Sequence, residues 1–501
     1  MAASILDYLE ESAVRVPNKT AFYDDRESLT FSQLRDKAKR IGSCVATITP
    51  PRSPVALLLD SRSIRNLPAM LGVLYAGCAY APLDLSMPLE RLKQLLTLLK
   101  PACVLADEKG QNALSGLKTT CLRYEDAVDT PIQEALLRRI REGASVYDPM
   151  SILYTSGSTG MPKGSVQTHF SYLQWTQATV SVYGLDEKTR FANQSPFFYA
   201  NSILEIFPPL ALGATVYLLP AGVLTFPRRM LACLNEQHIT CLCMTPSSFI
   251  SIAGADVLSP GCLPELKWGI MSGESMPWPP LALWMQASPN ACWWHFYGST
   301  EMFSVAVGKV DASHAREERL PVGRPFPLAH ILFLDEDGRE AAPGEPGEMY
   351  LSSPWIALGY HRDVQHTEAC WVTDPLHRGW YERFYRSGDM GYLRPDGQLM
   401  VLGRKDLQIK HRGYRMELGE VEAALWNADG VREGCILYDR EQDRIFCFYT
   451  GEAIEKDLRR QLSAGLARYM LPDVFLHLEE MPHTASMKVD RLALKERMNQ
   501  Q

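Results

Sequence analysis

Short apolar runs that end in glycine, proline or aspartate alternate along this chain with longer segments of helical periodicity. The runs VALLLD (55–60), CVLAD (103–107), TVYLLP (215–220) and LKWGIMSG (266–273) predict buried strands. The segment IRNLPAMLGVLYAGC (64–78) has helical spacing and ends near Gly77. Because strands that alternate with helices pair in parallel, the sequence predicts a mainly parallel α/β architecture.

A second kind of sequence begins after Gly359, where charged and turn-forming residues become frequent. PDGQ (395–398) predicts a turn between two strands, and GEVEAALWNADGV (419–431) predicts an amphipathic helix. The charged stretch Arg404–Lys405–Asp406 is the expected boundary. We therefore predict an N-terminal domain at 1–403 and a small α+β domain at 404–501.

Composition places the chain among ordinary globular proteins. Its 501 residues are 46% hydrophobic and 22% charged, with a net charge of −7 that disfavours nucleic acid as a partner. The N-terminus is acidic where a signal peptide would be basic. The most apolar stretch, 197–226, is interrupted by Asn201, Glu205 and several prolines and glycines, which predicts buried core. We expect a cytoplasmic protein without membrane spans.

The 12 cysteines are scattered, and several lie in apolar runs, so we expect reduced core thiols. The tightest group is Cys233, His238, Cys241 and Cys243, whose spacing matches no common zinc pattern. The surrounding ITCLCM alternates like a buried strand, so no metal is expected there.

A loop with the composition of a phosphate-binding site follows the apolar residues 150–153. Its sequence, YTSGSTGMPKG (154–164), contains three glycines, four serine or threonine hydroxyls and one lysine. Glycines allow backbone amides to turn inward, while hydroxyls and lysine add donors and positive charge. The spacing is not that of a Walker A loop. A flexible surface linker would not require Thr155, Thr159 and Lys163 together.

This loop resembles the signature loop of the adenylate-forming superfamily, which includes acyl-CoA ligases, luciferases and the adenylation domains of nonribosomal peptide synthetases. Five further segments resemble the family's motifs in the same order: FYGSTE (296–301), YRSGD (385–389), GRKD (403–406), QIKHRGYRMELGEVE (408–422) and MKVDR (487–491). The resemblance is closest to peptide-synthetase adenylation domains and stand-alone D-alanine–carrier ligases.

The resemblance implies a large N-terminal domain of α/β layers with a distorted β-barrel, and a mobile α+β lid that turns about a hinge near Asp406. It implies adenylation of a carboxylic acid with ATP and Mg²⁺, then transfer to the phosphopantetheine thiol of a carrier protein. The sequence contains no carrier domain of its own, so we expect the carrier to act in trans or to belong to a longer parent protein. An acyl-CoA ligase that uses free CoA is the nearest alternative. An inactive nucleotide-binding regulator is another, although the retained Lys163, Glu301, Asp389 and Lys488 argue against it.

The resemblance also implies residue roles. Thr300 would contact the α-phosphate, Glu301 would bind Mg²⁺, and Lys488 would bridge the acid and the α-phosphate. Tyr297 would stack on adenine, with Gly273, Glu274 and Ser275 on its other face, while Asp389 and Arg404 would bind the ribose. The β- and γ-phosphates would be held by Thr155, Ser156, Gly157, Ser158, Thr159, Gly160 and Lys163. For Glu301, Asp389 and Arg404, a plain surface charge is the alternative.

Four positions depart from the family pattern. Ser165 replaces an apolar residue, His295 an asparagine, Ser387 a threonine and Met487 a glycine. Basic residues also lie at or just after the hinge, where they would serve either carrier docking or a solvated face. These residues are Lys405, Lys410, His411, Arg412 and Arg415.

The acid's chemical class is predicted from one segment. Domains that use α-amino acids resemble one another in Phe-Asp-x-Ser-x-x-Glu, and here YANSILE (199–205) places Ala200 at the aspartate position. Without that counter-charge, burying an ammonium is costly, so we expect an acid without an α-amino group, with a β-amino acid as the main alternative. Phe296 would limit the depth, and Asn201 or Ser272 would bond one polar substituent. The remaining expected pocket residues are Tyr199, Leu204, Thr245, Ile270, Ser304 and Val305.

Overall fold

The computed structural model describes residues 4–117, 119–155, 161–274, 276–317, 320–377, 382–404, 408–483 and 489–498. The chain forms two compact units. The first comprises Met1–Leu85, Leu99–Leu153 and Gly164–Gly403. The second comprises Ser86–Leu98, Tyr154–Lys163 and Arg404–Gln501. Two short N-terminal segments thus group with the C-terminal residues, and the predicted division into a body and a lid stays a prediction.

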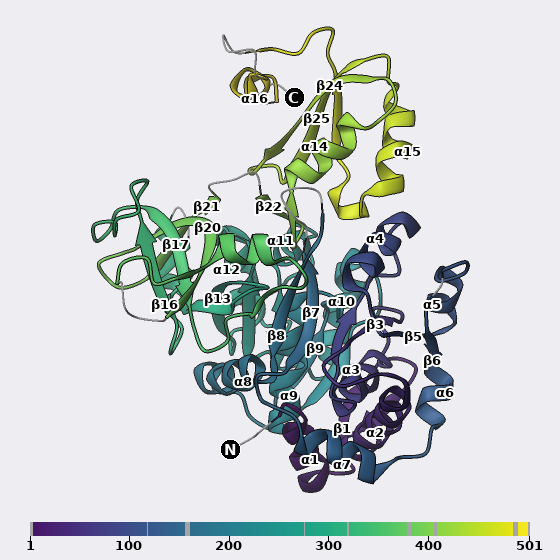
Figure 1. Ribbon diagram of the computed structural model, residues 1–501. Coiled ribbons are helices and arrows are strands. Elements are labelled where there is room, and N and C mark those ends of the chain that lie inside the picture. Colours follow the sequence, from purple (N-terminus) through teal and green to yellow (C-terminus); the bar gives the residue numbers. More distant parts are fainter. Residues whose placement is uncertain are drawn as a thin grey trace. The chain divides into compact units, whose positions relative to one another are not determined.

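The largest sheet of the first unit has nine strands and is parallel through its centre (Figure 1). Antiparallel pairs occur between β1 and β2 at one edge and from β13 to β15 at the other. In spatial order its strands are β15 Arg324–Pro325, β14 Phe303–Val310, β13 Cys292–Ser299, β12 Trp268–Ser272, β11 Cys241–Met244, β9 Arg190–Asn193, β10 Thr215–Leu218, β1 Thr20–Tyr23 and β2 Ser28–Thr30.

A second, seven-stranded sheet is parallel where β3, β4, β5, β6 and β7 pair, and β18 joins β8 in antiparallel fashion. Its strands, in spatial order, are β18 Gly359–Tyr360, β8 Lys163–Thr168, β7 Pro149–Thr155, β4 Ala79–Pro82, β3 Pro54–Leu58, β5 Cys103–Ala106 and β6 Cys121–Arg123.

The third sheet of the first unit is built from β16 His330–Leu334, β17 Gly347–Ser352, β20 Arg383–Leu393, β19 Trp371–Thr373 and β21 Leu399–Arg404. β16, β17, β20 and β19 pair in that order, and β21 pairs with β20, so the described strands form an open sheet and not a closed barrel. The second unit contains the hairpin β22 Gln408–His411 and β23 Tyr414–Glu417, and a three-stranded sheet of β24 Val431–Asp439, β25 Arg444–Gly451 and β26 Val474–His477.

The helices begin and end at residues that match their sequence signals. Thr30 caps α2 through a capping box, and Gly184 ends α8 in the left-handed conformation. The α-helices are α1 Leu6–Arg15, α2 Phe31–Ile48, α3 Asn66–Tyr75, α4 Leu89–Leu99, α5 Glu108–Ala113, α6 Tyr124–Asp129, α7 Glu134–Glu142, α8 His169–Tyr183, α9 Phe207–Leu212, α10 Pro227–Glu236, α11 Pro246–Ala253, α12 Trp278–Ala287, α13 Val364–Cys370, α14 Leu418–Trp426, α15 Glu455–Gly465 and α16 Arg491–Met498. Short 3₁₀ helices are η1 Ala200–Glu205, η2 Val223–Thr225, η3 Ala312–Arg316 and η4 Arg468–Met470.

Alternate residues of the nine-stranded sheet face two separate cores. On one face, Cys243, Ile270 and Trp294 pack in a cluster that includes residues of α8 and α9. On the other face, Leu242 and Met271 pack with residues of α10, α11 and α12. The sheet is therefore covered by helices on both sides, as expected for parallel strands that read as continuous apolar runs.

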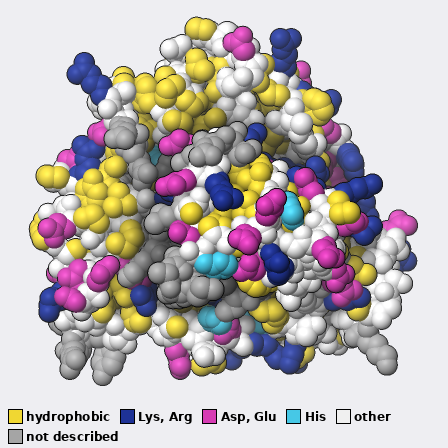
Figure 2. Space-filling view, turned by 90° about the horizontal axis from the view of Figure 1, so that it is seen from above, with side chains coloured by type: hydrophobic (Ala, Val, Ile, Leu, Met, Phe, Trp, Pro, Cys, Tyr) yellow, Lys and Arg dark blue, Asp and Glu magenta, His cyan; other side chains and the backbone are white. Residues whose placement is uncertain are grey.

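The structure confirms the predicted fold class, a mixed α/β chain with an α+β C-terminal part. The predicted strands near 55, 103, 215 and 266 appear as β3, β5, β10 and β12, and the helix near 64–78 appears as α3. All 12 cysteines are unpaired. No helix in the described part of the chain is long and apolar enough to cross a membrane. Acidic and basic side chains are interspersed on the face shown in Figure 2.

Candidate active site

The centre of the candidate site is the tight connection between β13 and β14, which carries Thr300 and Glu301. The backbone of Gly298 approaches the Phe303 carbonyl so closely that a Cβ at position 298 would lie 1.5 Å from its oxygen. Phe303 itself has a φ of +49°, which is uncommon for a bulky residue. The glycine of this motif is therefore required by the turn, and the turn brings Thr300 and Glu301 to the carboxyl end of β13.

Several hydrogen bonds hold this connection in place. The Gln167 side-chain amide on β8 donates to the Thr300 carbonyl at 3.1 Å and the Glu301 carbonyl at 3.3 Å. The Ala357 backbone amide also donates to the Glu301 carbonyl, at 2.9 Å. The Glu301 side chain is fully buried, and its Oε1 accepts from the Tyr360 hydroxyl at 2.9 Å. Glu301 is thus an oriented buried carboxylate, which rules out the surface-charge alternative for its position.

Ser165 and Ser387, two of the departures from the family pattern, have visible structural partners. The Ser165 hydroxyl lies 3.5 Å from the Thr300 carbonyl, at the limit of a hydrogen bond. The Ser387 hydroxyl donates to the Met349 carbonyl at 2.8 Å and accepts from the Asp389 amide at 3.0 Å. Both hydroxyls therefore support residues that the sequence places in the site.

Tyr297 and Asp389 come together although they are 92 positions apart, because the Tyr297 hydroxyl donates to the Asp389 carboxylate. Tyr297 is buried on β13, and Asp389 is half-buried on β20. The expected adenine-stacking and ribose-binding residues thus form one hydrogen-bonded pair.

His295 and Glu274 form a second link beside that pair. The His295 ring nitrogens lie 3.1 Å from the Pro321 carbonyl oxygen and 3.2 Å from the Glu274 carbonyl oxygen. The Glu274 carboxylate accepts from the Ser247 amide at 2.9 Å. Gly273 precedes it with a φ of +100°, which favours glycine. The histidine that replaces the usual asparagine therefore fixes the backbone of the 273–274 turn.

The remaining residues that are expected to bind the nucleotide belong to the second unit or fall outside the described residues. In the second unit, the Thr155 hydroxyl lies 3.5 Å from the Lys163 carbonyl, and Arg404 ends β21. The predicted site residues that lie outside the described residues are Ser156, Gly157, Ser158, Thr159, Gly160, Ser275, Asp406 and Lys488.

Strand register brings part of the predicted substrate pocket together. Ile270 on β12 lies opposite Trp294 on β13, and Ser272 lies opposite Phe296, so these side chains share one face of the sheet. Leu204 from η1 packs in the same cluster as Ile270 and Phe296. Ala200 begins η1, next to Tyr199 and Asn201, and the Asn201 Nδ2 and Ser272 Oγ atoms are buried without a partner among the described residues.

Three other predicted pocket residues have different surroundings. Ser304 accepts from the Trp175 indole of α8 at 3.2 Å. Val305 packs in a separate cluster with Tyr297. Thr245 follows β11, and its hydroxyl bonds with Ser247 and Ser248 at 3.0 and 3.1 Å.

Cys243, Gln167 and Tyr360 are candidate functional residues that the sequence analysis did not select. Cys243 lies opposite Ile270 in the register of β11 and β12, on the face that also carries Phe296. Its alternation with Cys241 in ITCLCM indicated a buried strand but not which face it would line. No sequence signal pointed to Gln167 or Tyr360, because their partners are 134 and 59 positions away.

Glu205, the last residue of η1, is a fully buried carboxyl at the wall of the pocket. Its Oε2 accepts from the Asn193 side-chain amide and lies 3.4 Å from the Ser195 amide, while Oε1 has no partner among the described residues. Burial raises the pKa of Glu205 well above its usual range. The folded protein therefore favours the protonated form of this carboxyl more than the unfolded chain does.

We expect Glu205→Gln to stabilise the protein more at pH 8 than at pH 5. Because the pKa of Glu205 is raised in the folded state, its carboxyl stabilises the fold at pH values below its pKa in the unfolded chain. This stabilisation is lost as pH rises through the folded-state pKa. Glutamine does not titrate, so the variant does not lose stability in this way. Thermal unfolding at both pH values measures the effect, and about 1 kcal/mol corresponds to roughly 1 °C in a chain of this size. Glu348→Gln is the control, since it removes a 2.6 Å ion pair with Arg386 and should lower stability. Equal destabilisation of Glu205→Gln at both pH values would contradict the assignment.

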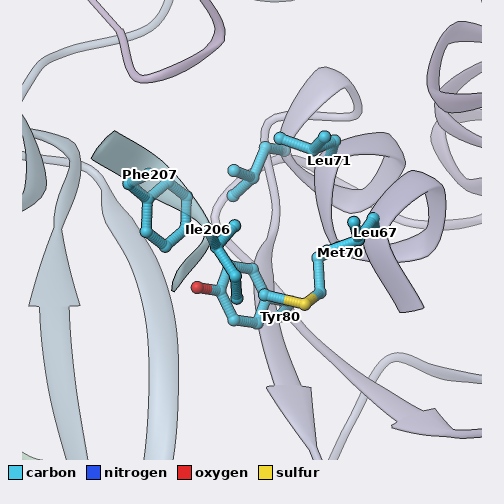
Figure 3. A pocket seen from close by; sticks show the side chains of 7 residues that line it. Leu67, Met70, Leu71, Tyr80, Ile206 and Phe207 are labelled. Atoms are coloured by element: carbon cyan, nitrogen blue, oxygen red, sulfur yellow. The ribbon is translucent and has the colours of Figure 1, made fainter. Parts of the chain in front are cut away.

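A separate apolar pocket lies between α3, Tyr80 of β4 and the residues Ile206 and Phe207 (Figure 3). Among the described side chains that line it, only Tyr80 carries a hydroxyl, which donates to the Tyr172 hydroxyl at 3.3 Å. It contains none of the predicted site residues and has no room for water, so we interpret it as a packing gap.

Comparison with known proteins agrees with this geometry. A family model described as AMP-binding enzyme matches residues 9–361. Malpinin synthetase of Mortierella alpina is 30% identical over 504 residues, which cover 97% of this chain but only 6% of that protein. Bacitracin synthase 1 of Bacillus licheniformis is 28% identical over 499 residues, covering 98% of this chain and 9% of that protein. The chain thus spans a small part of each of these relatives.

Two solved structures share the fold. The Vibrio cholerae adenylation domain AlmE, in complex with glycyl-adenosine-5'-phosphate, aligns with a TM-score of 0.87 at 20% identity, covering 100% of this chain and 98% of that one. PA1221, an NRPS protein containing adenylation and PCP domains, aligns with a TM-score of 0.83 at 25% identity, covering 99% and 97%. Together with the family match, the ordered motifs and the oriented Glu301, these findings show that the chain belongs to the AMP-binding enzyme family, whose members act as acid-activating ligases.

Proposed function

We propose that this enzyme adenylates a carboxylic acid that lacks an α-amino group and passes the acyl group to a thiol. In the first step the acid's carboxylate attacks the α-phosphorus of ATP, forming acyl-AMP and releasing pyrophosphate. A carboxylic acid of pKa about 4 is already ionised at neutral pH, so no general base is needed. The protein's task is to position the two reactants and to stabilise charge at phosphorus.

The observation that carries the proposal is the fixed Thr300–Glu301 connection, with a buried, oriented carboxylate at Glu301. Mg²⁺ in nucleotide enzymes is typically held by one or two carboxylates together with substrate phosphates. No cluster of three acidic, histidine or cysteine ligands occurs in the described residues, so these residues do not form a metal site from protein ligands alone. Glu301 alone, with ATP phosphates, fits the metal, which when bound would neutralise phosphate charge.

The nucleotide's other contacts are assigned by the motif resemblance. Tyr297 would stack on adenine, and Asp389 would bind the ribose hydroxyls. Support comes from their mutual hydrogen bond, which holds both side chains at the end of β13. Lys163 and the hydroxyls of 155–159 would hold the β- and γ-phosphates. Lys488 would enter from a lid that turns about Asp406.

The substrate class rests on the absence of a counter-charge in the described pocket. Ala200 offers no carboxylate. The nearest acid along the segment, Glu205, accepts a hydrogen bond from the Asn193 side-chain amide, and burial raises its pKa, which disfavours the ionised form that an ammonium would need. An unpaired buried ammonium costs several kcal/mol, which is about a hundredfold or more in specificity.

The test is acid-dependent pyrophosphate exchange with matched sets of three acids. Each set contains an α-amino acid, its deamino analogue and its α-hydroxy analogue. We expect the α-amino member to be the poorest substrate by about a hundredfold. Consistent preference for the α-amino member would show that the pocket argument is wrong, while preference for a β-amino acid would indicate another amine partner.

The acceptor is proposed to be the phosphopantetheine thiol of a carrier protein in trans. Support comes from the resemblance of residues 408–422 and 487–491 to peptide-synthetase adenylation domains. Acyl-AMP formed on the enzyme is offered either free CoA or a carrier protein that bears phosphopantetheine with a free thiol. Faster consumption by the carrier supports the proposal, and faster consumption by CoA supports an acyl-CoA ligase instead.

A further inference from the structure

Three hydroxyl side chains lie along one buried face of α8. Thr176, Thr179 and Tyr183 follow helical spacing and are 0%, 0% and 4% exposed. None of the three hydroxyls has a hydrogen-bond partner among the residues that the structure describes. We call these residues the hydroxyl row.

The hydroxyl row faces the same sheet surface as the predicted substrate pocket. At its start, the Trp175 indole donates to Ser304, which lies opposite Gly298 near the active-site end of β13. At its end, the Tyr183 ring packs edge-on against Trp294, with ring centres 5.0 Å apart. Between residues 175 and 183, α8 therefore runs alongside β13. It passes from the level of Gly298, at the catalytic end of the strand, to the level of Trp294, four residues earlier.

The sheet presents a matching donor to the end of the row. The Trp294 Nε1 atom is buried and has no partner in the described part of the chain. Burial raises the pKa of the Tyr183 hydroxyl well above its ordinary value, with Cys243 and Cys241 nearby adding to the shift. Tyr183 therefore keeps its proton at neutral pH. Two donors, the Tyr183 hydroxyl and the Trp294 indole, thus lie beside the deep end of the face that carries Cys243 and Ile270.

Native proteins pair almost all buried polar groups with protein atoms, ordered water or a ligand. Valine or phenylalanine at the same three positions would fill similar space without that requirement. An indole N–H can only donate, so the group that satisfies it must be an acceptor. Lys309, whose Nζ lies 5.1 Å from the Trp294 ring centre, is exposed and does not neutralise a buried anion, so an uncharged acceptor suits the indole N–H.

We infer that the hydroxyl row and Trp294 form the deep wall of the acyl pocket, and that this wall selects acids with an uncharged oxygen substituent far from the carboxylate. The inference rests on the proposed function. Phe296 lies two residues nearer the active-site end of β13 and on the same face, so we expect its ring to favour flat aromatic or unbranched acids. A hydroxyl or carbonyl oxygen on such an acid would accept from Trp294 and bond with Tyr183.

The test compares pairs of acids that differ by one oxygen: benzoate with 4-hydroxybenzoate, 3-phenylpropanoate with 3-(4-hydroxyphenyl)propanoate, and hexanoate with 6-hydroxyhexanoate. Adipate, which carries a second carboxylate, is the charged comparison for the last pair. Calorimetry gives Kd for each acid without ATP, and pyrophosphate exchange gives kcat/KM. We expect the hydroxylated member of at least one pair to bind about tenfold more tightly. Tyr183→Phe and Thr179→Val should reduce that preference to about twofold or less, while binding of the deoxy member stays unchanged.

Thr450→Val is the matched control, because Thr450 is also a fully buried hydroxyl without a partner among the described residues and belongs to the second unit. It should leave the preference intact. Equal binding within every pair, or a preference that survives both α8 variants, would overturn the inference, and a preference for adipate would overturn its requirement for an uncharged group. Selective binding of a hydroxy acid without any exchange would instead refute the proposed adenylation while supporting the deep wall.

Discussion

Replacing Lys488 by alanine should lower acid-dependent pyrophosphate exchange about a thousandfold. The motif resemblance places this lysine between the acid and the α-phosphate, and losing one charge-assisted contact of about 4 kcal/mol in the transition state has that effect. Thioester formation from pre-made acyl-AMP should be nearly unaffected, because the proposed lid rotation removes Lys488 before that step. Rapid-quench assays of the two half-reactions measure both effects separately.

Lys495→Ala is the control for this variant, since it removes an exposed lysine from α16 a few residues further along the chain. It should leave both half-reactions within about twofold of the unmodified enzyme. Equal losses in both half-reactions of Lys488→Ala would mean that the lysine does not act specifically in adenylation.

Glu301→Gln should reduce exchange about a hundredfold to a thousandfold and raise the Mg²⁺ concentration needed for ATP binding. Glutamine keeps the shape and the acceptor for the Tyr360 hydroxyl but removes the charge that the metal requires. Exchange rates across a Mg²⁺ series, together with calorimetric binding of ATP, measure the two consequences.

Tyr360→Phe separates charge from orientation. It removes the hydrogen bond to Glu301 and leaves the carboxylate, so we expect a loss of about tenfold or less. If Glu301→Gln bound ATP with an unchanged Mg²⁺ requirement, the carboxylate would be structural, and its metal role would have to be abandoned.

Much of the fold could be predicted because its strands are short, apolar and bounded by turn residues. β3, β5, β10 and β12 are continuous apolar runs, as buried parallel strands require. Two of the site motifs could be placed because they lie at strand ends, where Gly273 and Gly298 allow turns that other residues resist. Local sequence carries this information directly.

The supporting contacts could not be predicted, because they join residues far apart in the chain. Gln167 bonds the Glu301 backbone across 134 positions, and the Tyr297–Asp389 bond spans 92. His295 and Ser165 looked like departures from a pattern until their partners, Glu274 and Thr300, were visible. Thr176 and Thr179 showed only helical spacing, and their missing partners became apparent only in the packed structure.

The most direct test of acid activation by this enzyme is acid-dependent exchange of labelled pyrophosphate into ATP, with the acyl-AMP identified by mass spectrometry. A panel of aryl, acyl, hydroxy, keto, α-amino and β-amino acids is offered to the enzyme with Mg²⁺. We predict exchange with at least one acid that lacks an α-amino group, and an adenylate of the matching mass. Binding of ATP without exchange for any acid would contradict this prediction and would support an inactive nucleotide-binding protein instead.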